Sequence, residues 1–572
     1  MMKKNKWKVI LTSTVMVAAL LLSACGNGGN EQTSQSNNQA ESRPEMEIGE
    51  GGIPAIMNPI GTLPIVNEPV TLSVAVSQPS GIDFDTNPMS AWFEEQTGVS
   101  VEWIQIPAAD FDARINLMLA TGDLPDIIVS RGLDNHATVA FYAGMDLLRP
   151  ISPYLEEFAP NLMHAFELYP TVHTDMIMND GLIYGFPDFD DAFHLYMPQK
   201  LWINTAFLEE ANMPMPTTMD EFYDTLVAFR DLDSNILPFV GASGTGHGPG
   251  MGHNIENILG RFVTTDMENR LLVEDGQVTP VFNTNEWREG LRFLNRMYNS
   301  GLIAPETFVQ DRAGLRAIGD NPGQAIAGVM PALWLGQVVS VDIEDQEGRW
   351  NDYRVIPFLE TAEGRRMNYL RPLVGNHRAV ITNNLPEELM PVAVRWLDNF
   401  YTEVSTFHSM QGFEDVNWRF SDPGEVGIDG SPAVWERLVG APTYGVEDNS
   451  IWTQQPFPTL RTHAWRLSER ADRSIVEQET LLYDETRKMY EFANPLSIIL
   501  PVLIFDEAEA AELVDLQIPI NSFVAESVVL FTMGELDIET QWDWYLEQLE
   551  SLGLPRLLEI NQIAYDARMA AQ

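Results

Sequence analysis

Hydrophobic and polar residues alternate at the start of the globular part of the chain. Valine and leucine occupy every second position from Val70 to Val76, with threonine, serine and alanine between them, and this period of two predicts a β-strand. The pattern then predicts a helix over 89–96, a strand over 99–106, a helix over 110–120 and a short strand over 126–129. Strands that alternate with helices in this way predict an α/β fold with a parallel sheet.

Helical periodicity continues in the rest of the chain. Thr218 and Glu221 have the spacing of a capping box, ahead of apolar residues at helical spacing. Further helices are predicted over 287–298, 391–401, 475–492 and 540–552. A chain of 572 residues exceeds the size of a single hydrophobic core, so we expect two lobes. Beyond the N-terminal segment, we find no apolar run long and uncharged enough to span a bilayer.

The N-terminal segment has the pattern of a signal peptide. Four lysines, Lys3, Lys4, Lys6 and Lys8, precede an apolar run over 9–22. This run is shorter than a typical transmembrane helix. The sequence Leu-Ser-Ala-Cys at 22–25 resembles the lipobox of bacterial lipoproteins, which implies cleavage before Cys25 and acylation of its thiol. Cys25 is the only cysteine, so no intramolecular disulfide can form. We expect a signal peptide at 1–24 and a flexible, polar tether at 25–65.

The charge balance excludes some partners and suggests an environment. The chain has 82 acidic and 34 basic residues, a net charge of -48, which disfavours nucleic acid and anionic lipid surfaces. After the signal peptide only Lys200 and Lys488 are lysines, and the other basic residues are arginines. Arginine keeps its charge above pH ~10, where lysine loses it. We therefore hypothesise an alkaline exterior, with compositional drift as the alternative.

Motifs for catalysis or metal binding are missing from the sequence. It has no His-Glu-x-x-His, no Gly-x-Ser-x-Gly and no Walker lysine motif. The glycine-rich stretch 241–250 lacks the lysine of a phosphate-binding loop, so we interpret it as a surface loop. Asp188, Asp190 and Asp191 could mimic a catalytic cluster, but we interpret them as a solvated acidic loop.

Several ordered segments resemble one protein family. Residues 116–128, Asn-Leu-Met-Leu-Ala-Thr-Gly-Asp-Leu-Pro-Asp-Ile-Ile, resemble a signature of the extracellular solute-binding proteins of carbohydrate ABC importers, in the large lipoprotein subgroup of Gram-positive bacteria. Further matches follow in the expected order at 180–187, 201–204 with 216–222, 301–308, and 542–545 with 560–566. The resemblance covers nearly the whole mature chain.

The resemblance implies a two-lobe periplasmic-binding-protein-like (type II) α/β fold, with a hinge and a ligand cleft between the lobes. Lobe 1 would comprise 66–186 plus 376–403, and lobe 2 would comprise 187–375 plus 404–572. Many relatives carry a calcium-loop-like segment where this chain has residues 231–238 without the glycine turn and the distal carboxylates. We therefore expect no bound metal and no cofactor.

The implied function is capture of an oligosaccharide and its delivery to the transmembrane subunits of an ABC permease. The protein would be a monomer, palmitoylated at Cys25 and anchored at the extracellular face of the cell membrane. It would bind no nucleic acid and catalyse no reaction. An anchored polysaccharide-acting enzyme and a peptide-binding or sensory lipoprotein stay open as alternatives.

A sugar site needs aromatic platforms for C–H patches and polar groups for hydroxyls. Trp334 is our first candidate platform and Trp418 the second, with a core position as the alternative for each. We expect Asp83, Asp134 and Asp190 to accept hydrogen bonds from hydroxyls, and Arg131 and Arg371 to donate, unless these arginines pair with surface acids. These side chains are expected at loops that follow strands, because ligands of α/β sheets bind beyond the carboxyl ends of the strands.

Overall fold

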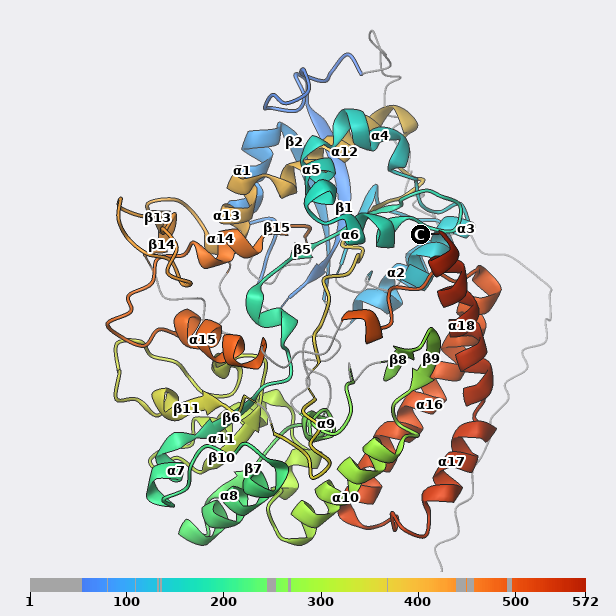
Figure 1. The fold of residues 1–572 in the computed structure, drawn as a ribbon. Coiled ribbons are helices and arrows are strands. Elements are labelled where there is room, and N and C mark those ends of the chain that lie inside the picture. The colour runs from blue at the N-terminus through green and yellow to red at the C-terminus, as the bar shows by residue number, and fades with distance from the viewer. Residues whose placement is uncertain are drawn as a thin grey trace, which may run out of the picture. The chain divides into compact units, whose positions relative to one another are not determined.

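The computed structural model describes residues 54–79, 81–107, 110–130, 133, 136–243, 254–265, 269–357, 359–367, 369–438, 449, 457–490 and 496–571. All of them belong to one compact unit, Glu47–Gln572. The unit contains two separate main sheets (Figure 1).

The first sheet has five strands in the order β2 (Val99–Pro107), β1 (Val70–Gln78), β3 (Ile127–Val129), β12 (Ala379–Ile381) and β4 (Gly185–Phe186). β1 pairs in parallel with both β2 and β3, while β12 is antiparallel to β3 and β4. β4 therefore runs in the same direction as β1. Helices α1 (Pro88–Thr97), α2 (Phe111–Thr121) and α3 (His136–Gly144) alternate with these strands, which confirms the α/β prediction.

The second sheet has four strands in the order β11 (Tyr353–Val355), β6 (Leu201–Asn204), β10 (Ala327–Pro331) and β7 (Leu237–Phe239). β10 is parallel to β7, and β6 is antiparallel to both β10 and β11. The start of β6 therefore lies at the same end of the sheet as the carboxyl ends of the other three strands.

Two crossing segments connect the carboxyl ends of the two sheets. Residues 187–200 lead from β4 to β6, and residues 356–378 lead from β11 back to β12. Side chains that follow strands in either sheet are thus brought to the two ends that the crossing segments join, where ligands of α/β proteins bind.

Helices complete both parts. Thr218 accepts a hydrogen bond from the backbone N–H of Glu221 at the start of α8 (Met219–Leu232), so the predicted capping box is present. The other elements are α4 (Ser152–Phe158), α5 (Pro160–Leu168), α6 (Pro170–Met176), β5 (Phe189–Asp190), η4 (Phe193–Tyr196), α7 (Thr205–Glu210), α9 (Glu256–Leu259), β8 (Leu271–Glu274), β9 (Gln277–Pro280), α10 (Asn285–Asn299), η5 (Pro305–Phe308), α11 (Arg312–Gly319), η6 (Leu335–Gln337), η7 (Arg349–Asp352), η8 (Glu387–Leu389), α12 (Met390–Asp398), η9 (Asn399–Tyr401), α13 (Glu403–Gln411), β13 (Trp418–Phe420), β14 (Trp435–Arg437), β15 (Leu460–Arg461), α14 (His463–Leu467), α15 (Gln478–Tyr490), η10 (Leu496–Ile498), α16 (Glu507–Met533), α17 (Trp542–Ser551) and α18 (Leu554–Ala571).

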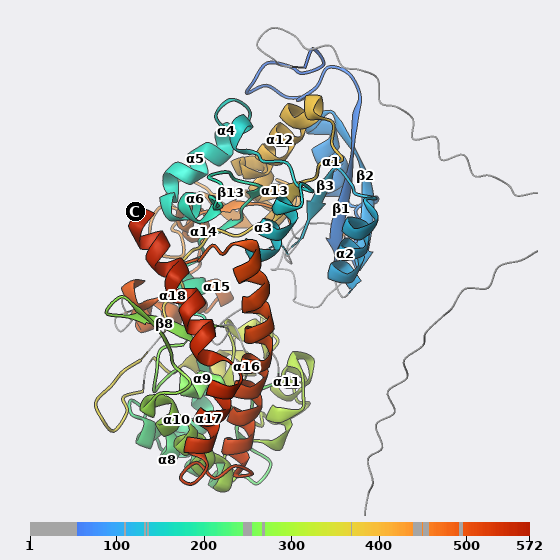
Figure 2. The same ribbon diagram turned by 90° about the vertical axis from the view of Figure 1, so that its right-hand side faces the viewer.

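The C-terminal helices pack on the core of the second sheet. The long helix α16 runs beside α10 and α18 (Figures 1 and 2). Contrary to the sequence analysis, Ala508–Met533 is long and apolar enough to cross a membrane, with a mean hydropathy of 1.4. Its residues Ile520, Val524, Val528 and Phe531 recur at helical spacing and are buried in the protein core. This stripe is the pattern of a helix that packs on other helices.

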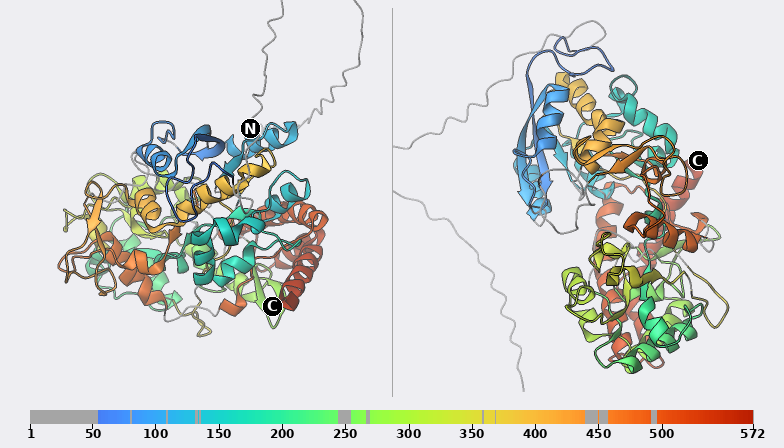
Figure 3. Two further views of the ribbon diagram at one scale, coloured as in Figure 1. Left: turned by 90° about the horizontal axis from the view of Figure 1, so that it is seen from above. Right: turned by 90° about the vertical axis from the view of Figure 1, so that its left-hand side faces the viewer.

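The segment after α12 corrects one predicted lobe boundary. We expected all of 404–572 in the second lobe, but α13 lies near α1 and α12, with β13, β14 and α14 next to it (Figures 1 and 3). His408 of α13 stacks on Trp92 of α1 with ring centroids 4.3 Å apart. Phe457 packs against Phe84 and Trp103 of the first sheet's part. Aromatic contacts thus attach the chain between α12 and α15 to the first lobe.

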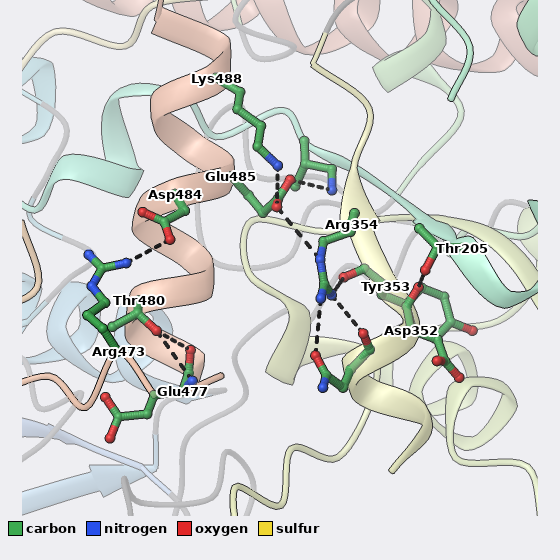
Figure 4. Close-up of polar contacts among 12 residues, drawn as sticks. Thr205, Asp352, Tyr353, Arg354, Arg473, Glu477, Thr480, Asp484, Glu485 and Lys488 are labelled. Carbon is green, nitrogen blue, oxygen red and sulfur yellow. Dashed lines mark hydrogen bonds and ion pairs between the residues drawn. The ribbon is translucent and has the colours of Figure 1, made fainter. Parts of the chain in front are cut away.

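Helix α15 lies on the second sheet through buried polar contacts (Figure 4). Glu485 is buried and accepts a hydrogen bond of 3.0 Å from the backbone N–H of Val355 in β11. Its other oxygen accepts from Lys488 at 2.6 Å. The chain therefore reaches the second lobe again at α15.

Candidate binding site

The structure brings the described candidate residues of the sequence analysis to the carboxyl ends of the two sheets, except for Trp418. Asp83 follows β1, Asp190 lies just beyond β4, and Arg371 precedes β12. Trp334 follows β10 of the second sheet. Arg131, Asp134 and Cys25 lie outside the described residues.

Asp83 is held by its neighbours at the end of the first sheet. Its carboxylate accepts hydrogen bonds from Gln105 Nε2 at 3.0 Å and from Thr86 Oγ1 at 2.8 Å. These bonds, the one from Gln105 first, lower the pKa of Asp83. The group is therefore an ionised acceptor with a fixed orientation.

The three aspartates of the first crossing segment are not a solvated loop, so that interpretation is wrong. Asp188 is 9% exposed and Asp191 is 8% exposed. Asp188 accepts from Thr459 Oγ1 at 2.6 Å, and Asp190 pairs with Arg461 at 3.2 Å. These bonds tie the crossing segment to β15.

Asp191 accepts hydrogen bonds from two tyrosines. Tyr169 donates from the first lobe at 2.8 Å, and Tyr196 donates from η4. Burial, followed by the bond to Asp191, raises the pKa of both hydroxyls. All three aspartates thus have structural partners, and none is left as one of a free catalytic pair.

Half-buried aromatic side chains surround the first crossing segment, and the sequence analysis missed them. Phe193 stacks on Tyr490 of α15, with ring centroids 4.7 Å apart. The ring centroid of Tyr483, also of α15, lies 5.0 Å from that of Phe193. Arg371 joins this region, because its backbone N–H donates to the carbonyl of Tyr196 at 2.9 Å. Phe193 lies in a non-periodic segment, and although Tyr483 and Tyr490 lie in the helix predicted over 475–492, helical periodicity does not show which distant residues they contact.

The two tryptophan candidates differ in exposure. Trp334 is partly buried against the core of the second sheet, and its ring lies so close to Gly336 that a Cβ at that position would collide with it. Trp418 is only 3% exposed. It stacks on Phe407 at 4.2 Å, and its indole N–H donates to the carbonyl of Gly412 at 2.9 Å. Trp418 is therefore a core residue, which corrects its assignment as a platform.

A pocket of about 480 Å³ opens beside the carboxyl end of the first sheet. The N-terminal part of α2 and one side of α3 form one wall, and the start of α16 forms the other. Phe141, which is 42% exposed, and the bonded pair Tyr142–Asn116 line it. One wall comes from helices that pack on the first sheet and the other from α16, which packs on the core of the second sheet, so a molecule bound there would contact both lobes.

The region that aligns with the calcium loop of relatives has no cluster of ligands. Asp233 accepts hydrogen bonds from the backbone and side-chain nitrogens of Asn235, both at 2.9 Å, and Asp231 pairs with Arg230 at 2.9 Å. Among the residues that the structure describes, no group of three His, Cys, Asp or Glu could hold a metal ion.

Two α/β sheets whose carboxyl ends are joined by crossing segments define the class of two-lobed solute-binding proteins. The family model described as bacterial extracellular solute-binding protein matches residues 78–353. Residues 78–353 are thus similar to bacterial extracellular solute-binding proteins.

Individual relatives support the same class. The chain is 22% identical to the fructooligosaccharide ABC transporter substrate-binding protein FusA of Streptococcus pneumoniae, over 99% of each chain. It is 27% identical to lipoprotein LipO of Bacillus subtilis, over 49% of this chain and 54% of LipO. The solved structure of the pneumococcal FusA with kestose has a TM-score of 0.71 at 20% identity, and the match covers 88% of this chain and 100% of that one.

Proposed function

We propose that this protein is the substrate-binding component of an ABC importer, which captures an oligosaccharide and delivers it to the permease without chemical change. The observation that carries the proposal is the similarity to FusA along the entire chain, which includes both lobes and the crossing segments. The buried Asp188 and Asp191 are bonded to structural partners, which also favours binding over hydrolysis.

The site's chemistry suits a sugar. Aromatic faces pack on the C–H patches of sugar rings, and charged groups at the same edge bond to hydroxyls. Trp334 would supply a platform from the second lobe, while Asp83, Asp190 and Arg371 would supply polar contacts at the end of the first. Arg131 and Asp134, which lie between β3 and α3 in the sequence, complete the proposed set. Closure of the lobes about the crossing segments would remove these contacts from water.

Cys25 is the proposed point of attachment to the membrane. Acylation there would hold a monomer at the extracellular face of the cell membrane, close to the permease, with the polar residues 25–65 as a tether. Mass spectrometry of the membrane-extracted protein should detect lipid on Cys25. In a Cys25→Ala variant the protein should lose this lipid, and an unchanged lipid signal would refute the assignment.

Thermal unfolding with a panel of oligosaccharides tests the binding function. The chain without its signal peptide should be stabilised by one glycan class, by ~2.7 kcal/mol at a ligand concentration of about 100 times the dissociation constant. Chromatography of the same samples should show no product. A shift accompanied by cleavage would favour the enzyme alternative, and a shift with peptides alone would refute the sugar assignment.

Trp334→Ala serves as the site variant in the same assay. It should keep the unfolding temperature of the ligand-free protein within a few degrees and lose most of the ligand-induced shift, because a partly exposed platform contributes mainly to binding. Trp418→Ala is the matched control, since it removes a buried, stacked ring and should lower the unfolding temperature without ligand. If Trp334→Ala keeps the full ligand shift, Trp334 is not a platform.

A further inference from the structure

Arg261 is a buried arginine that has no acidic partner. It follows α9 and is 1% exposed, and its Nη2 donates to the backbone carbonyl of Gln199 at 2.9 Å. Its Nε and Nη1 have no acceptor, and no ion pair involves it in the part of the chain that the structure describes. Nearby Arg270, in contrast, binds both carboxylate oxygens of Glu256, at 3.0 and 2.8 Å. An unpaired buried guanidinium is costly, particularly in a chain with 82 acidic residues that could have supplied a partner.

Gln199 supplies an unpaired acceptor next to this donor. Its Nε2 donates to the carbonyl of Thr265 at 2.5 Å, which fixes the orientation of the amide. Its Oε1 is buried and receives no hydrogen bond. A Cβ at Gly260 would collide with this oxygen. Because Gly260 has an ordinary helical φ of -59°, the glycine here provides space for the amide rather than backbone freedom.

The pair lies at the end of the second sheet where a ligand is expected. Gln199 belongs to the first crossing segment, immediately before Lys200 and β6. The carbonyl of Lys200 accepts from the backbone N–H of Ala332 at 3.1 Å, just beyond the carboxyl end of β10. The unpaired atoms of Gln199 and Arg261 are therefore on the same end of the sheet as Trp334.

We propose that Gln199 and Arg261 form a binding subsite for hydroxyl groups of a neutral sugar, an inference that rests on the proposed transport function. Hydroxyls accept hydrogen bonds from the guanidinium and donate to the amide oxygen, so they satisfy both unpaired groups. A carboxylate accepts only, and would leave Gln199 Oε1 unpaired beside a second negative oxygen. Both side chains are buried in this structure, so a sugar reaches them only when residues 254–265 and the crossing segment move apart.

The variants Arg261→Met and Gln199→Met test this subsite. Each removes the unpaired polar atoms together with one hydrogen bond to a backbone carbonyl, and keeps most of the side-chain volume, so the ligand-free unfolding temperature should change by only a few degrees. Affinity for the neutral oligosaccharide that stabilises the unmodified protein should fall at least ~10-fold, measured by calorimetry. Arg270→Met is the control, because it leaves the buried Glu256 without its cation and should lower the unfolding temperature.

The outcomes separate the subsite from the function. If no glycan binds the unmodified protein, the transport function fails and with it the subsite. If a neutral glycan binds the unmodified protein and both variants equally well, only the subsite is refuted. Loss of stability in both variants with unchanged affinity would assign the two residues to the protein's own framework. Selective loss of an acidic oligosaccharide, such as an oligogalacturonide, would overturn the preference for hydroxyls.

Discussion

Lys200 illustrates at the residue scale how burial makes stability depend on pH. Its side chain is fully buried and donates to the carbonyls of His194, at 3.0 Å, and Met197, so it stabilises the end of η4. Burial lowers the pKa of Lys200 well below its ordinary value. Between that lowered pKa and about 10.5 the unfolded chain binds one more proton than the folded chain, so the free energy of unfolding rises with pH.

Lys200→Met should remove this rise. As pH increases through that window, the unmodified protein should therefore gain unfolding free energy relative to the variant. Urea unfolding at several pH values between 6 and 10.5 measures it. Lys488→Met is the matched control, because Lys488 is 50% exposed and paired with Glu485. A pH-independent difference for Lys200→Met would mean that burial does not lower the pKa of Lys200.

The sequence predicted local features of single residues and missed those that depend on distant contacts. The capping box of Thr218 and Glu221 was predictable because both residues lie within one helical turn. The burial of Trp418 was not, since its ring is covered by Phe407 of α13. Asp191 resembled a solvated acid because its partner Tyr169 lies on another element.

At the scale of elements, one buried ion pair fixes the C-terminal helix. Arg568 of α18 binds Asp175 of α6 at 2.5 Å, and Asp175 is 1% exposed. The second carboxylate oxygen of Asp175 accepts from the backbone N–H of Gly375 in the second crossing segment at 2.9 Å. One carboxylate therefore connects a helix packed on the second sheet, a helix of the first lobe and a crossing segment.

Arg568→Met should destabilise the protein by about 3–5 kcal/mol, because it leaves Asp175 buried without its cation. Arg556 lies on the same helix α18 and pairs with Glu512 of α16 and with Glu559, but all three side chains are more than 40% exposed, so Arg556→Met should cost much less than Arg568→Met. Chemical unfolding of both variants at pH 7 provides the comparison. Equal losses would contradict a special role of the Asp175 contact.

Element positions were predictable where the pattern was regular, and lobe membership was not. The helices expected over 287–298 and 540–552 correspond to α10 and α17. The segment between α12 and α15 was assigned to the wrong lobe because its attachment depends on pairs such as Trp92 and His408, which are distant in sequence. The polar ends of both sheets followed from the strand order, but which side chains meet there did not.

At the scale of the whole molecule, tyrosine ionisation should set the upper pH limit of stability. Burial, as the largest cause, raises the pKa of Tyr184, Tyr353 and Tyr490 to about 12. Between about pH 10, where unfolded tyrosines ionise, and pH 12, the folded protein binds more protons than the unfolded chain. The free energy of unfolding therefore falls in this window, by about 2–3 kcal/mol for the fully buried Tyr353.

Below about pH 10, tyrosine ionisation should have little effect on the unfolding temperature. Above about pH 10, the unfolding temperature should drop steeply. Arginine, which makes nearly all the ion pairs of the described residues, keeps its charge throughout this range. Calorimetry between pH 7 and 11.5, with tyrosinate absorbance recorded in parallel, tests the coincidence of the two transitions. Stability retained to pH 10 would support the alkaline exterior suggested by the scarcity of lysine. A steep loss by pH 9, before tyrosine ionises, would contradict it and favour compositional drift.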